Sequence, residues 1–189
     1  QKQLDESLYF SARNGHVDCV QPLIDSGADV DSRGWFGGPA LHWAAVNGFD
    51  AIVKRLIDAG SDPNIRDSRF KAHAAGWANE GGHASIRDWL LDHGCKESIV
   101  EAAAFGRIER VEEFLNDDPG LVNTNEGRTP LHEAAGRGHS DILKLLLAHG
   151  ADRTNVDSNG LTPLDWATRG QQNQIIAILK PEDIESAKT

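Results

Sequence analysis

One stretch of the chain recurs at a fixed interval. Residues 129–152 read TPLHEAAGRGHSDILKLLLAHGAD, and similar stretches begin at Glu6, Pro39 and Thr162. The leucine of the first turn falls at Leu8, Leu41, Leu131 and Leu164. The first two and the last two of these leucines are each 33 residues apart (41 − 8 and 164 − 131). A period of this length predicts an array of small units that bury their apolar faces against one another.

Each unit carries the signals of two helices. Thr129 is a good helix N-cap, and Pro130 suits the first helical turn, where its missing N–H has no partner to lose. Gly138 and Gly150 stand where helices end in a left-handed residue. Small or apolar residues recur at helical spacing between these signals, at Leu131, Ala134, Ala135, Ile142, Leu145 and Leu146. One such helix pair cannot bury its own face, so the pattern predicts a one-dimensional solenoid.

These residues resemble the ankyrin-repeat family, from about Leu4 to about Lys180. The resemblance implies an all-α solenoid of stacked helix-turn-helix units with β-hairpin fingers. Two further copies are divergent: one has Ala75 at the leucine position and the other has Ile99. Both are similar to patterns in bacterial members of the family. The predicted single domain spans residues 1–180, with units at about 5–38, 39–71, 72–97, 98–127, 128–160 and 161–180, and a polar C-terminal tail at 181–189.

The spacing is irregular in the middle of the chain. Leu41 to Ala75 is 34 residues, one longer than the period, and Ala75 to Ile99 is only 24. This leaves almost no room for a finger, so we expect it to be missing between units three and four. Ser98 and Glu101 have the spacing of a capping box, which replaces the missing Thr-Pro start.

The third unit has lost its usual first turn. His73, Ala74 and Ala75 stand where the other units read Thr-Pro-Leu. A leucine-sized hollow in a regular backbone would cost about 2–5 kcal/mol, as core Leu→Ala changes do. We therefore expect partial collapse with Phe70 turned inward. A remaining void is the alternative, and it would form a small-molecule or peptide site in the notch near Ala74 and Ala75.

Composition argues against several classes of partner. The formal net charge of −10 disfavours a nucleic-acid phosphate backbone, which needs clustered Lys and Arg. No run of about 18 apolar residues is present, so we expect no membrane partner. The two cysteines are too few for a disulfide framework and favour an intracellular, cytoplasmic location. The absence of Met and the start at Gln1 are compatible with a trimmed N-terminus.

The chemically reactive residues have framework explanations. The resemblance implies that His42 and His132 hydrogen-bond a neighbouring finger, while five more histidines flank glycines that end helices. Only His73 is out of register, and a zinc site needs three or four converging ligands. Cys19 and Cys95 lie far apart, and neither can be placed beside a His or Asp that the framework does not explain. We therefore expect no catalytic residue, no metal and no cofactor, and predict that the chain is not an enzyme.

Aromatic residues gather where the resemblance implies a concave binding groove. The position two residues after the motif leucine holds Phe10, Trp43, Trp77 and Trp166, but Glu101 and Glu133 in units four and five. These rings either face the groove or pack under the fingers, and the sequence leaves both open. The predicted partner-binding residues are Trp35, Phe36, Trp43, Arg69, Phe70, Trp77, Glu80, Glu101, Phe105, Glu133, Arg137 and Arg169.

These features favour non-catalytic binding of a protein partner on the concave face of first helices and fingers. Exposed aromatic clusters mark interaction sites, where Trp, Tyr and Arg supply much of the binding energy. Two alternatives stay open: the small-molecule or peptide site near Ala74 and Ala75, and self-association through the aromatic rings. The chain is accordingly expected to be a monomer or a weak homodimer.

Overall fold

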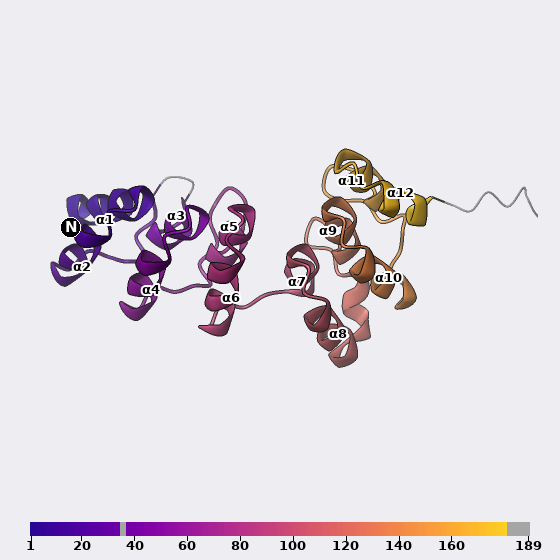
Figure 1. The fold of residues 1–189 in the computed structure, drawn as a ribbon, viewed down its shortest axis with the longest axis horizontal. Coiled ribbons are helices and arrows are strands. Elements are labelled where there is room, and N and C mark those ends of the chain that lie inside the picture. Colours follow the sequence, from indigo (N-terminus) through magenta and orange to yellow (C-terminus); the bar gives the residue numbers. More distant parts are fainter. Residues whose placement is uncertain (35–36, 181–189) are drawn as a thin grey trace, which may run out of the picture. The chain divides into compact units, whose positions relative to one another are not determined.

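A computed structural model describes residues 1–34 and 37–180, and these residues form paired helices (Figure 1). The first helices of the pairs are α1 (Lys2–Asn14), α3 (Ala40–Val46), α5 (Ala74–Glu80), α7 (Ile99–Phe105), α9 (Pro130–Arg137) and α11 (Pro163–Arg169). The second helices are α2 (Val17–Asp25), α4 (Asp50–Asp58), α6 (Ala84–Asp92), α8 (Ile108–Asp117), α10 (Ser140–Ala148) and α12 (Asn173–Leu179). The predicted all-α repeat fold is confirmed.

The chain divides into two compact units, Gln1–Lys96 and Glu97–Thr189. The division falls within residues 93–98, the short connection between α6 and α7 where a finger was predicted to be missing. Each unit contains three helix pairs. The organisation of residues 1–180 as a single domain stays a prediction.

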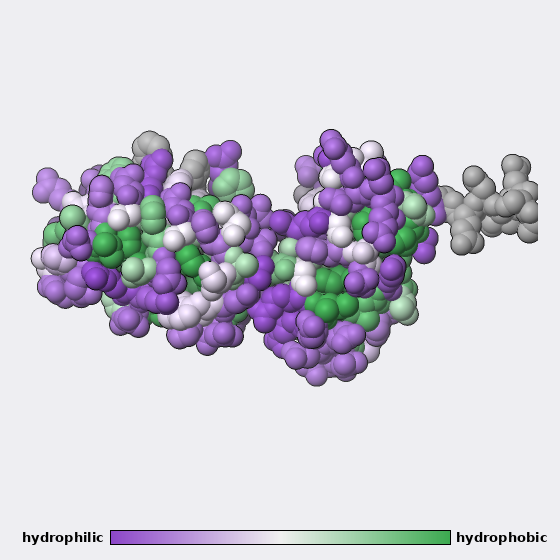
Figure 2. Space-filling model, viewed as in Figure 1, coloured by the Kyte–Doolittle hydropathy of each residue, from purple (hydrophilic) through white to green (hydrophobic). Residues whose placement is uncertain are grey.

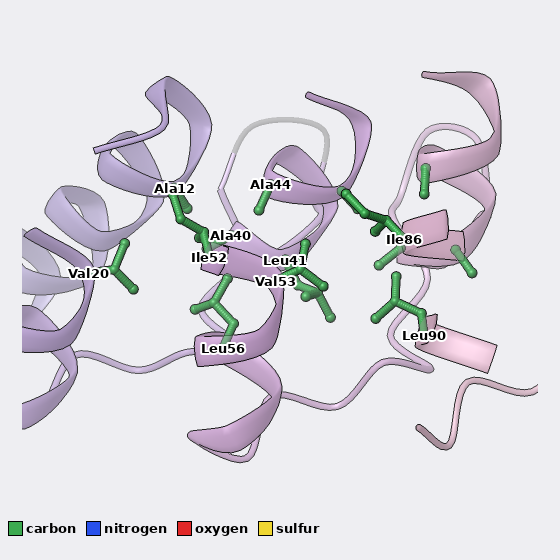
Figure 3. Close-up of a cluster of buried hydrophobic side chains, with 14 of the residues drawn as sticks. Ala12, Val20, Ala40, Leu41, Ala44, Ile52, Val53, Leu56, Ile86 and Leu90 are labelled. Atoms are coloured by element: carbon green, nitrogen blue, oxygen red, sulfur yellow. The ribbon is translucent and has the colours of Figure 1, made fainter. Parts of the chain in front are cut away.

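The core of the first unit lies between successive helix pairs. Helix α3 packs against both α1 and α5. Its Leu41 is completely buried, and Ala44 and Ala45 beside it are small enough to let the neighbouring helices approach closely. The second helices contribute larger side chains to the same core, including Val20, Ile52, Leu56, Ile86 and Leu90 (Figure 3). The sequence pattern therefore places apolar residues between units, as a stacked array requires.

The second unit repeats this arrangement around α9, which packs against α7 and α11. Leu131, Ala134 and Ala135 are completely buried, as the helical spacing predicted. In α10 the buried stripe consists of Ile142, Leu143 and Leu146, whereas Leu145 is only partly buried.

The helix ends follow the sequence signals. Gly138 ends α9 in the left-handed region at φ 82°. The capping box before α7 is confirmed, because Ser98 Oγ accepts from the Glu101 N–H at 3.3 Å and a Glu101 carboxylate oxygen accepts from the Ser98 N–H at 2.9 Å. His73 also has a structural role. Its ring Nδ1 accepts a hydrogen bond from the Gly76 N–H at 3.2 Å, so it caps α5 in place of threonine.

The fingers differ from the expected β-hairpins. Across residues 1–34 and 37–180 no strand is formed, and the fingers are turns closed by one or two backbone bonds, such as Asp67 N–H to Ala72 O at 3.0 Å. Between α8 and α9 the connection instead contains a short 3-10 helix, η2 (Pro119–Asn123).

The expected inward turn of Phe70 is wrong, because its side chain is 58% exposed. Asp67 holds the finger closed by accepting the Phe70 N–H at 2.7 Å. The extra residue of this finger is accommodated by Lys71, which adopts a left-handed φ of 56°. Ala74 and Ala75 are nevertheless completely buried in the core of the first unit.

Candidate protein-interaction surface

Five aromatic side chains form a continuous row across the first unit, here called the aromatic row. It consists of Phe10 and Tyr9 from α1, Trp43 from α3, Trp77 from α5, and Phe70 from the finger before α5. Neighbouring rings meet edge-on, with centroid distances along the row of 5.6, 6.2, 5.2 and 6.0 Å. This is the geometry that aromatic quadrupoles prefer, so each ring helps to fix the next one.

The two ends of the row are exposed and its interior is not. Phe10 is 45% exposed and Phe70 58%, whereas Trp77 is only 7% exposed. Trp43 is partly buried, and the guanidinium of Arg13 lies 4.6 Å from the centroid of its ring. The row therefore presents two apolar rings to solvent on a base of packed indole rings.

Tyr9 is the member of the row that the repeat spacing did not identify, because it precedes the expected position by one residue. The finger before α3 accommodates it at Gly34. A Cβ atom at Gly34 would overlap the Tyr9 ring. The sequence signal that could have indicated this close approach is the glycine itself, which stands where the matching fingers carry Asp67 and Asp157.

Trp77 is anchored by the finger that lies over it. Its indole N–H donates to Asp67 Oδ2 at 3.1 Å, and the same carboxylate accepts the backbone N–H groups of Arg69, Phe70 and Ala72. Burial of Asp67 disfavours its charged form, but these four hydrogen bonds outweigh burial and lower its pKa below the usual value. Trp77 therefore packs under its finger, and Phe70 lies outside.

A hollow of about 470 Å³ adjoins the Phe10 end of the row. Its lining combines Tyr9 and Phe10 with two carboxylates, Asp5 and Glu6, and with Arg33 from the finger. Hydrophilic residues cover much of the face drawn in Figure 2, with hydrophobic ones between them.

His42 lies against Trp77, with ring centroids 5.5 Å apart. Its Nε2–H donates to the Ala72 carbonyl at 3.2 Å, which confirms the expected bond to the finger. Nδ1 must then be the acceptor, yet no described residue donates to it. Burial is the main cause that lowers the pKa of His42 to about 4, so the ring stays neutral near pH 7.

The equivalent histidine of the second unit, His132, has the hydrogen-bond donors that Nδ1 of His42 lacks. There His132 Nε2–H donates to the Leu161 carbonyl at 2.9 Å, while its Nδ1 accepts from the Thr129 hydroxyl at 2.8 Å and the Thr129 N–H at 3.2 Å. In the first unit Pro39 stands at the position of Thr129, and proline has neither a hydroxyl nor an N–H.

The remaining predicted residues fall into several environments. Trp35 and Phe36 lie outside the described residues. Arg69 is exposed, with its guanidinium 5.1 Å from the Phe70 ring centroid, and Glu80 is exposed at the end of α5. These two and the aromatic row belong to the first unit. Glu101, Phe105, Glu133, Arg137 and Arg169 belong to the second unit.

The predicted residues of the second unit do not share one role. Glu101 is engaged in the capping box of α7, and Phe105 is partly buried at the end of that helix. Glu133 is almost completely buried between the guanidinium groups of Arg128 and Arg137. Arg169 is exposed at the end of α11. Because sequence spacing reports helix position but not burial, it could not separate these environments.

No cluster of three or more His, Cys, Asp or Glu side chains that could hold a metal ion is found within residues 1–34 and 37–180. In the same residues, no helix is both long and apolar enough to cross a membrane. Cys19 is exposed, Cys95 is buried, and both are free thiols.

Comparison with known proteins agrees with this architecture. The family model for ankyrin repeats, in three copies, matches residues 4–67 and 99–188. A palmitoyltransferase, AKR1 of Lachancea kluyveri, is 30% identical over 89% of this chain and 25% of its own length. The ankyrin repeat domain-containing protein 40 of Mus musculus is 30% identical over 48% of this chain and 25% of its own length. The human transient receptor potential cation channel subfamily A member 1 is 39% identical over 44% of this chain and 8% of its own length.

The chain thus spans a quarter or less of these relatives. The unmatched residues 68–98 contain the divergent third repeat, in which α5 and α6 still form the usual helix pair. The match covers well over half of the chain, and the helix pairs extend through the part it leaves out. The chain belongs to the ankyrin-repeat family.

Proposed function

We propose that the first unit is a non-catalytic module that binds a partner protein through the aromatic row. One observation carries the proposal: two exposed rings, Phe10 and Phe70, end a row whose interior is packed and in which Trp77 is hydrogen-bonded to Asp67. Large rings held by buried supports lose little conformational entropy on binding. Burying a phenylalanine side chain contributes about 1.5–3 kcal/mol, so two such rings can anchor an interface.

Charged groups of both signs surround the row. Asp5, Glu6 and Arg33 line the hollow next to Phe10, and the guanidinium groups of Arg13 and Arg69 lie against the rings of Trp43 and Phe70. These charges do not select a partner of one sign. We therefore infer a segment that places apolar side chains on Phe10 and Phe70.

Membership of the ankyrin-repeat family supports binding as the general role, because these repeats commonly mediate contacts between proteins. Palmitoyl transfer is the activity named for one relative, and this chain matches only a quarter of that protein. We infer that the matched quarter shares its repeat architecture with our chain and that binding is the shared role. An intracellular, cytoplasmic setting fits the two free thiols.

The test compares three forms of the full chain. A partner captured with the wild-type protein is titrated against the Phe10→Ala/Phe70→Ala variant and against Val156→Ala. Val156 is a matched control, because its side chain is 48% exposed but lies in the second unit. We expect at least about a ten-fold loss of affinity for the double variant, which corresponds to about 1.4 kcal/mol, and no change for the control.

Two outcomes would contradict the proposal. Full affinity of the Phe10→Ala/Phe70→Ala variant would show that the row does not bind the partner. A concentration-dependent dimer in sedimentation velocity that this double variant abolishes would instead assign the row to self-association.

A further inference from the structure

The second unit contains a pocket of about 510 Å³ whose chemistry differs from that of the aromatic row. It lies along α9 and α11 and the finger between them. Its lining includes three arginines, two buried carboxylates, a glycine and an indole ring: Arg128, Arg137, Arg169, Glu133, Asp157, Gly136 and Trp166. All of these residues lie within Glu97–Thr189.

The pocket is open because two positions differ from their counterparts in the first unit. Counting from the motif leucines, Leu131 and Leu41, the second residue is Glu133 instead of Trp43, and the fifth is Gly136 instead of Val46. The first unit therefore has an indole and an isopropyl group where the second has a carboxylate and a hydrogen atom. A Cβ at Gly136 would lie 2.9 Å from Cε3 of Trp166, so this glycine also lets the indole pack closely against α9.

Two of the three arginines hold the Glu133 carboxylate between them. Glu133 is 2% exposed, and its Oε1 and Oε2 contact the Nε atoms of Arg128 and Arg137, the second at 2.9 Å. The side chains of these arginines are still 45% and 34% exposed, so both remain partly accessible to solvent. A guanidinium carries five N–H donors, and the contact of Arg128 with Glu133 uses its Nε–H.

A second carboxylate in the lining is also engaged. Asp157 accepts the backbone N–H groups of Leu161 and Asn159 and the indole N–H of Trp166 at 2.9, 2.8 and 3.0 Å. The bond from Leu161 is the main cause that lowers the pKa of Asp157, to about 2, so the group is charged near pH 7. Three arginines against two carboxylates leave the lining with a net charge of +1 (3 − 2).

We propose that this pocket binds the carboxylate of a glutamate or aspartate side chain in an extended segment of a protein partner. Planar guanidinium groups match a carboxylate in two-pronged hydrogen bonds. A net charge of +1 is neutralised by one carboxylate, whereas a phosphate dianion would leave an excess negative charge. Leu161 and Trp166 in the lining provide apolar contact for the methylene groups of the bound side chain.

The site does not depend on the aromatic row, which belongs to the other unit. Loss of the proposed function in the Phe10→Ala/Phe70→Ala variant leaves the pocket unchanged. Loss of carboxylate binding in a pocket variant likewise leaves the row unchanged. The two proposals can therefore fail separately.

The experiment is an NMR titration of the full ¹⁵N-labelled chain with short blocked peptides. The probe is acetyl-Ala-Ala-Glu-Ala-Ala-amide, and the matched control carries Gln in place of Glu. The readouts are the indole N–H signal of Trp166 and the Nε–H signals of Arg128, Arg137 and Arg169. We expect saturable shifts of these signals with the Glu peptide and at least about ten-fold weaker binding of the Gln peptide, because charged hydrogen bonds are the stronger ones.

Two arginine variants localise the effect. Arg169→Gln is expected to weaken binding of the Glu peptide about five-fold, the magnitude of an exposed ion pair. Arg153→Gln is the control, because Arg153 lies in the same unit outside the pocket lining and donates to the Ile178 carbonyl. Its affinity should stay at the wild-type value.

Three results would overturn the assignment: no saturable shift with the Glu peptide, equal binding of the Gln peptide, or equal effects of the two arginine variants. Tighter binding of the corresponding phosphoserine peptide would also reject a carboxylate as the preferred ligand. The comparison between Glu and Gln peptides uses only the wild-type chain, so it holds even if a variant folds poorly.

Discussion

The indole N–H of Trp77 donates to Asp67 Oδ2 across 3.1 Å, which ties the third repeat to the finger that precedes it. The sixth repeat contains the same pairing between Trp166 and Asp157 at 3.0 Å. In both places the aspartate also accepts backbone N–H groups within its own finger. One carboxylate therefore closes a turn and orients the indole beneath it.

Replacing Asp67 by Asn should destabilise the first unit by about 2 kcal/mol, because the amide nitrogen would face N–H donors and leave buried groups unsatisfied. Urea denaturation followed by circular dichroism measures the change. Asp62→Asn is the control, since Asp62 is exposed and accepts only one local bond in its finger, from Asn64. Equal stability of the two variants would contradict the role assigned to Asp67.

The free energy of unfolding should decrease as the pH falls from about 6.5 to about 4. Burial holds the pKa of His42 at about 4 in the folded chain, whereas an unfolded histidine has a pKa of about 6.5. In this window the unfolded chain binds a proton that folded His42 does not, so protonation favours unfolding. The difference of about 2.5 units corresponds to about 3 kcal/mol.

Urea denaturation at several pH values isolates this contribution when the wild type is compared with His42→Gln. The negative charge of Asp67 and the neighbouring His73 also act on the ring, in opposite directions. An unchanged slope of stability against pH in His42→Gln would assign the loss to other groups.

The double substitution Pro39→Thr/Ala40→Pro should stabilise the first unit by about 1 kcal/mol, the net value of a typical hydrogen bond. It supplies His42 Nδ1 with the hydroxyl and N–H that Thr129 gives to His132. The backbone at Pro39 is extended, at φ −72° and ψ 176°, close to that of Thr129. Pro39→Val/Ala40→Pro restores the N–H but not the hydroxyl, so thermal unfolding of both variants separates the two bonds.

Gly34→Ala should destabilise the first unit by about 1–3 kcal/mol, as overpacking does, because the new methyl group would overlap the Tyr9 ring. A double-mutant cycle with Tyr9→Ala tests the cause. The cost of Gly34→Ala should shrink when the ring is absent. Additive costs would show that the glycine is needed for another reason.

Local sequence patterns predict much of this structure. The 33-residue period, the helix caps and the shortened connection before Ile99 identify the repeat family and the order of its helices. These features act over a few residues, because N-caps, left-handed glycines and apolar spacing depend on local backbone geometry. For the same reason, the capping role of Glu101 could be recognised from its spacing to Ser98.

Burial and pairing across repeats were decided only by the tertiary structure. Spacing placed Trp77, Trp43 and Glu133 at equivalent positions, yet Trp77 is buried under Asp67, Trp43 is partly buried in the aromatic row, and Glu133 is enclosed by two arginines. The exposure of Phe70 likewise depends on its packing with Asp67 and Trp77, and the pocket beside Gly136 depends on Trp166, 30 positions further along the chain (166 − 136). The sequence by itself determined the repeats and their helices, whereas packing between repeats decided which equivalent positions became a surface, a support or a pocket.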